Sequence, residues 1–117
     1  YRYGNYLGKV YVFHASNAGS GITATTSSSG AGGPNATITG IASNTEFSFG
    51  LAAADLNGDG YADVLAGAVV NGGGAFVFNA SNTGGGITAT TAVTGAGGPS
   101  AAITGEGSGD FFGESVQ

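Results

Sequence analysis

The 117-residue sequence has no cysteine and very little charge. Without cysteine, it can form neither a disulfide nor a thiolate-bound metal site. Only 8% of its residues are charged, against about 25% in an average globular protein. Arg2 and Lys9 are the only fixed cations, and the net charge is −5. Nucleic acids and anionic membrane surfaces are therefore not expected as partners, because the chain offers them almost no counter-charge.

Long hydrophobic runs are also missing. The longest is Val64–Val70, well short of the roughly 18 apolar residues that a membrane-spanning helix needs. Membrane insertion is therefore not expected. The length allows one small domain with a single hydrophobic core.

What the sequence does have is an internal repeat. Val12–Gly40 reads VFHASNAGSGITATTSSSGAGGPNATITG, and Val77–Gly105 reads VFNASNTGGGITATTAVTGAGGPSAAITG. At this offset of 65, the two segments are identical at 21 of 29 positions. With a two-residue deletion, the match extends to Phe47–Gly50 and Asp110–Gly113. A period of this length is typical of one supersecondary unit stacked beside its copies. The chain is expected to be either part of a longer array or a protomer whose copies complete one another.

The apolar residues alternate at the spacing of strands and nowhere at the spacing of a helix. One unit is predicted to hold four strands, at Phe47–Ala54, Ala62–Val70, Gly74–Ser81 and Ala101–Gly105. Matching strands are expected at Lys9–Ser16, Asn35–Gly40 and Phe111–Gln117. The Gly/Ser/Thr-rich segment Asn17–Asn35 is either a loop or an extra hairpin. The prediction is an all-β fold of propeller blades with four antiparallel strands each; a β-solenoid is the alternative, although its turns are shorter.

An acidic loop, DLNGDGYAD, separates the first two strands of this unit. Five potential oxygen donors stand at its alternate positions: Asp55, Asn57, Asp59, Tyr61 and Asp63. If the loop curls, four side chains and the backbone carbonyl of Tyr61 can converge on Ca²⁺, which prefers six to eight oxygens. The twelfth position is an alanine where an EF-hand needs glutamate, so the loop is not an EF-hand. The alternative is an Asx-rich turn that binds nothing.

The segment Phe47–Ala68, FSFGLAAADLNGDGYADVLAGA, resembles the FG-GAP repeat of integrin α-subunit propellers and their prokaryotic relatives. Phe49-Gly50 matches the FG, and Ala66–Ala68 matches the GAP end without its proline. The resemblance implies a β-propeller with Ca²⁺ bound on loops that join the first two strands of a blade. It divides the chain into a partial blade of outer strands (1–46), a complete blade with the calcium loop (47–105) and the start of another blade (106–117).

No pair of nucleophile and base is visible in the sequence, so an enzyme is not expected. The single histidine, His14, has Asn79 at the matching position of the second copy. The leading prediction is an extracellular or cell-surface calcium-binding module for adhesion, recognition or surface assembly, with a protein or glycan ligand. One alternative is a structural subunit of a filament or oligomer assembled through sheet edges. Another is the non-catalytic propeller part of a larger secreted hydrolase or lyase. Asn35 and Asn79 stand in N-glycosylation patterns.

Overall fold

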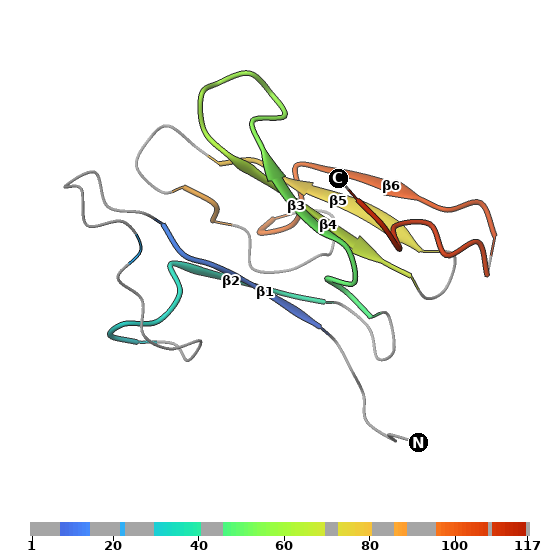
Figure 1. The fold of residues 1–117 in the computed structure, drawn as a ribbon, viewed down its shortest axis with the longest axis horizontal. Coiled ribbons are helices and arrows are strands. Elements are labelled where there is room, and N and C mark those ends of the chain that lie inside the picture. Colours follow the sequence, from blue (N-terminus) through green and yellow to red (C-terminus); the bar gives the residue numbers. More distant parts are fainter. Residues whose placement is uncertain are drawn as a thin grey trace.

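The computed structural model describes residues 8–14, 22, 30–40, 46–69, 73–80, 86–88, 96–107 and 109–116. These residues form two antiparallel sheets and no helix, which confirms the all-β prediction (Figure 1). The smaller sheet pairs β1 (Lys9–Val12) with β2 (Ala36–Thr39). The larger sheet runs in chain order through β3 (Leu51–Ala54), β4 (Asp63–Ala68), β5 (Gly74–Phe78) and β6 (Ala101–Thr104).

The larger sheet contains the four strands predicted for one unit. Its middle strands, β4 and β5, are apolar on both faces, and most of their residues are buried or half-buried. β6, at the edge, is exposed along its whole length. Most of Asn17–Asn35, where an extra hairpin is one alternative, lies outside the described residues, so that alternative stays a prediction.

The sequence repeat is also a structural repeat. β1 and β2 pair with Lys9 opposite Thr39, and β5 and β6 pair with Gly74 opposite Thr104. Both members of each pair shift by the same 65 positions, so the two copies share one register. Backbone bonds next to the strands repeat as well: the Gly40 N–H donates to the Gly8 carbonyl, and the Gly105 N–H donates to the Gly73 carbonyl.

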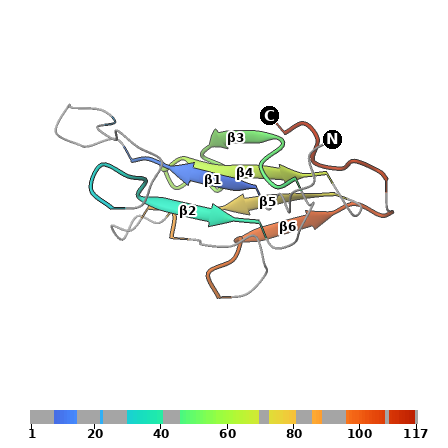
Figure 2. The same cartoon turned by 90° about the horizontal axis from the view of Figure 1, so that it is seen from below.

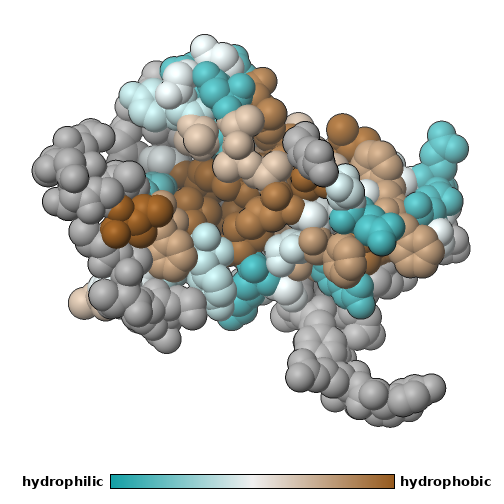
Figure 3. Space-filling model, viewed as in Figure 1, coloured by the Kyte–Doolittle hydropathy of each residue, from teal (hydrophilic) through white to brown (hydrophobic). Residues whose placement is uncertain are grey.

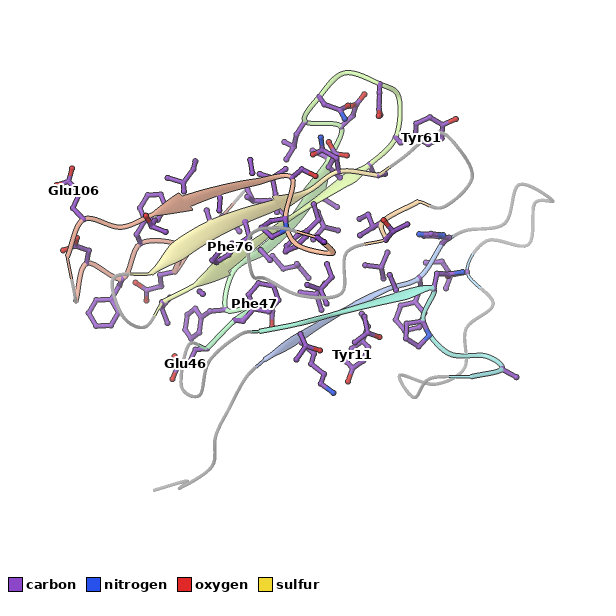
Figure 4. All side chains as sticks on the ribbon, turned by 180° about the vertical axis from the view of Figure 1, so that it is seen from behind. Tyr11, Glu46, Phe47, Tyr61, Phe76 and Glu106 are labelled. Carbon is purple, nitrogen blue, oxygen red and sulfur yellow. The ribbon has the colours of Figure 1, made fainter. Side chains whose placement is uncertain are left out.

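The hydrophobic core lies between the two sheets. Val10 and Ile38 project from the smaller sheet toward Ala66 and Phe78 of the larger one. Phe47 precedes β3 and also belongs to this core, with its ring centroid 6.0 Å from that of Phe76 and 6.3 Å from that of Phe78, both edge to face. Figure 4 shows Phe47 and Phe76 in the layer between the sheets. Each fully buried side chain of this size contributes about 1.5–3 kcal/mol, so this layer holds the sheets together.

The smaller sheet covers only part of the larger one, because it has two strands where the larger has four. A groove of about 440 Å³ remains beside β1, lined by apolar residues of β1, β3 and β4 that include Val12, Leu51 and Val64. In Figure 3, hydrophobic surface crosses the middle of this face. Seen through both layers in Figure 2, the strands of the two sheets run in similar directions, as in aligned sheet packing.

The predicted strand at Phe47–Ala54 is wrong at its start, and the strand predicted at Phe111–Gln117 does not form among the described residues. The chain turns at Glu46 and Ser48, which have positive φ angles of 47° and 70°, and β3 begins only at Leu51. Phe111 and Gly113 repeat this turn with φ angles of 52° and 91°. Among the described residues after position 110, the structure shows one isolated bridge, between Phe112 and Gly73, and no strand.

At each of these turns the backbone passes close to a glycine of another segment. A Cβ atom at Gly8 would collide with the backbone of Phe47, and one at Gly73 would collide with the backbone of Phe112. Both glycines also have positive φ angles, which other residues rarely adopt. Phe47 and Phe112 are therefore equivalent at the constant offset of 65, without the two-residue deletion that matching the Phe-Gly pairs suggests.

Candidate metal site

The acidic loop joins β3 to β4 and projects from the end of that hairpin (Figure 1). Of the five predicted donor residues, four are exposed and one, Asp63, is fully buried. Gly58 and Gly60 have φ angles of 79° and 90°, as a tightly curled loop requires. Nothing lies near the Cβ position of either glycine, so conformation and not crowding accounts for glycine there.

The side chain of Asp55 organises the first half of the loop. Its Oδ1 accepts hydrogen bonds from the backbone N–H groups of Gly58 (2.7 Å) and Asp59 (3.1 Å). Its Oδ2 accepts one from the N–H of Gly60 (2.8 Å). Three backbone donors thus point at one carboxylate, and this fixes the curl of the loop around its first acidic residue.

Asn57 and Asp59 continue the same pattern two residues at a time. Asn57 Oδ1 accepts a hydrogen bond from the Asp59 N–H (2.9 Å), and Asp59 Oδ1 accepts one from the Tyr61 N–H (2.9 Å). These are Asx turns, in which a side chain caps the backbone two positions later. Asn57 Nδ2 also donates to Asp59 Oδ2 (3.2 Å), which brings the two side chains together.

Asp63 has a different environment, at the start of β4. Its Oδ2 accepts a hydrogen bond from the Leu56 N–H (2.9 Å), at the opening of the loop. Its Oδ1 accepts one from the Ala80 N–H (2.9 Å), which follows β5. The buried carboxylate therefore ties together the two ends of the loop and the neighbouring strand. Sequence reasoning did not identify Leu56 or Ala80, because both act through backbone groups that leave no mark on residue type.

The chemistry of the donor set fits a hard cation. It consists only of oxygen, from three carboxylates, one amide and the Tyr61 carbonyl, and each carboxylate oxygen can accept more than one interaction. The described part of the chain nevertheless holds no group of three or more His, Cys, Asp or Glu side chains gathered closely enough to hold a metal. The loop thus presents suitable oxygens in order along a curled backbone, with its carboxylates engaged by backbone N–H groups.

The other acidic residues lie away from this loop. Glu46, Glu106, Asp110 and Glu114 are all exposed. Figure 4 shows Glu106 and Glu46 far from Tyr61, the labelled residue of the loop. Asp110 caps a local turn through a 2.7 Å hydrogen bond from the Gly107 N–H to its Oδ2. The acids outside the loop therefore form no second cluster among the described residues.

Residues 47–78 match the FG-GAP repeat family. The matched segment begins at the buried Phe47 and runs through β3, the acidic loop, β4 and β5, and this likeness covers residues 47–78 of the 117-residue chain. Comparison with curated proteins and with solved structures found no significant match. Within the described residues, no helix is long and apolar enough to cross a membrane.

Proposed function

We propose that this chain is a non-enzymatic, extracellular β-propeller-type module that binds Ca²⁺ in the loop between β3 and β4 and serves adhesion, recognition or surface assembly. The observation that supports it most is the position of the loop. The loop that carries the all-oxygen donor set joins the first two strands of a four-stranded antiparallel sheet. It lies inside the segment that matches the FG-GAP repeat. Each sheet would then be a blade or part of one, with the core between them as the contact between blades.

The residues that would hold the ion are Asp55, Asn57, Asp59, Asp63 and the carbonyl of Tyr61. Bound Ca²⁺ would neutralise carboxylates that otherwise repel one another and would lock the connection between β3 and β4. An ion that binds only the folded chain stabilises it by about 2.7 kcal/mol at a free concentration of 100 times the dissociation constant. Extracellular sites of this oxygen type work at millimolar calcium, which suits a secreted or surface-exposed module.

The test compares thermal unfolding in calcium and in chelator. We expect the unmutated chain to melt at a higher temperature in calcium, and Asp59→Ala to lose most of that gain while changing little in chelator. The side chain of Asp59 is exposed, so the loss would come from the missing ligand and not from a damaged core. Glu106→Gln is the matched control, because it also removes an exposed carboxylate but lies outside the loop.

Equal melting curves in calcium and chelator for the unmutated chain would refute calcium binding. An equal loss in Asp59→Ala and Glu106→Gln would refute this loop as the site, because it would show an effect of net charge alone. Isothermal titration of the apo chain with CaCl₂, with MgCl₂ as comparison, would measure the affinity directly.

A further inference from the structure

The contact between the two sheets is built from residues that recur in the sequence. The smaller sheet contributes one face, on which Ile38 lies beside Val10. The larger sheet contributes the opposite face with Phe78, and Ile87 and Phe47 join it from outside the strands. Because the copies share one register, each of these residues has a known counterpart 65 positions away.

Three of these buried residues, Ile38, Phe47 and Ile87, have exposed counterparts, whereas the counterpart of Val10 is buried (Ala75) and that of Phe78 is half-buried (Phe13). Ile38 is 0% exposed, and its counterpart Ile103 is 58% exposed. Phe47 is 3% exposed, and Phe112 is 40% exposed. In the third pair the buried residue is the one later in the chain: Ile87 is 4% exposed, whereas its counterpart in the first copy, Ile22, is 62% exposed. In these three pairs, the same residue type at the same place in the unit is thus buried in one copy and exposed in the other.

These exposed residues form two different surfaces. The C-terminal surface consists of Ile103 and Phe112. In the other copy of the unit, the matching residues are Ile38 and Phe47, which form one side of the contact between the sheets. The N-terminal surface consists of the exposed Tyr11 and Ile22 with the half-buried Phe13, and it is the counterpart of the side that contains Phe76, Phe78 and Ile87. In Figure 4, Tyr11 points away from the larger sheet, so it takes no part in the core between the sheets.

We propose that the C-terminal surface of one copy docks on the N-terminal surface of a second copy, so that copies of this chain associate head to tail by repeating the contact between the sheets. Phe112 of one copy would pack against Tyr11 and Phe13 of the other, as Phe47 packs edge to face against Phe76 and Phe78 within one chain. The second copy is the occupant to expect because the molecule already contains this pair of surfaces in contact. The interface is heterologous, so each copy keeps one free surface and association continues beyond a dimer unless a ring closes.

This proposal goes beyond the calcium loop and does not depend on it. It also differs from pairing through sheet edges, because the docked surfaces are sheet faces and the side chains beside them. No residue of either surface lies between Asp55 and Asp63. Calcium binding and head-to-tail association can therefore succeed or fail separately.

The experiment blocks one surface at a time and then mixes the variants. Ile103→Glu places a charge on the C-terminal surface, and Tyr11→Glu places one on the N-terminal surface. Sedimentation velocity should show concentration-dependent association of the unmutated chain and monomers for each variant alone. An equimolar mixture should form a 1:1 dimer that grows no further, because the two intact surfaces meet and the two blocked ones face outward. Ala96→Glu, an exposed turn position outside both surfaces, should associate like the unmutated chain.

Several results would overturn the proposal. The unmutated chain could stay monomeric up to its solubility limit, both variants could associate normally, or Ala96→Glu could abolish association. A mixture that stays monomeric while both variants keep the unmutated melting temperature would also exclude a head-to-tail interface. If Ile103→Glu or Tyr11→Glu lowers the melting temperature, Phe112→Glu and Ile22→Glu replace them, since neither residue lies in a described strand.

Discussion

At the scale of single residues, Asp59 and Asp63 show how one short loop gives two acids different surroundings. Asp59 is exposed and bonds only within the loop, to the Tyr61 N–H and the Asn57 amide. Asp63 is fully buried and receives N–H groups from Leu56 and from Ala80, seventeen residues away. A bound ion would affect both, but only Asp63 is needed to hold the fold without one.

Asp63→Asn should therefore destabilise the chain even in chelator. An asparagine has one carbonyl oxygen, so it can accept from Leu56 or from Ala80 but must turn its own N–H₂ group toward the other. A buried donor left unsatisfied in this way costs about 1–3 kcal/mol. Urea unfolding in chelator measures the loss, with Asp59→Asn as the matched control that should stay close to the unmutated chain. Equal midpoints for the two variants would contradict the structural role of Asp63.

At the scale of elements, β2 and β6 have the same place in two copies of one unit but different neighbours. Ile38 of β2 faces the larger sheet, whereas Ile103 of β6 faces solvent in the single chain. Register and residue type are the same, so the difference in burial isolates the effect of packing.

Ile38→Ala should cost about 2–5 kcal/mol, because it removes buried methyl groups and leaves a cavity between the sheets. Ile103→Ala, its matched control, should stay within about 0.5 kcal/mol of the unmutated chain, as exposed positions usually do. Urea unfolding of both variants in dilute solution, where copies do not associate, would compare them. Similar losses would mean that the core between the sheets contributes little to stability.

The sequence predicted the elements better than it predicted the site. Alternation in Lys9–Ser16 predicted β1, its copy at Gly74–Ser81 predicted β5, and the apolar run in Ala62–Val70 predicted β4. The turn before β3 was missed because Glu46 and Ser48 adopt positive φ angles without being glycine. The acidic residues of the loop could be selected by spacing. The burial of Asp63 could not, because it depends on the backbone N–H of Ala80, which is brought near only by the pairing of β4 with β5.

At the scale of the whole molecule, the two sheets that pack against each other differ in size, with two strands in one and four in the other. The smaller sheet leaves part of the larger one uncovered, and the groove beside β1 results from this difference. The layer that joins the sheets contains small and aromatic side chains in alternation, with Ala66 and Ala68 beside Phe47 and Phe78. Such a layer tolerates little change in volume, since both larger and smaller side chains disturb close packing.

The shared register has a consequence for how the chain reaches this arrangement. A folding chain can pair β1 with β6 almost as well as with β2, because the two partners are near-copies. Closing the loop from Lys9 to Thr39 spans 30 residues, and closing it from Lys9 to Thr104 spans 95. Loop entropy favours the shorter closure by only about 1 kcal/mol, or roughly fivefold. Refolding from urea should therefore include a minor slow phase, as mispaired strands separate and search again, and single-exponential refolding at every temperature would speak against it.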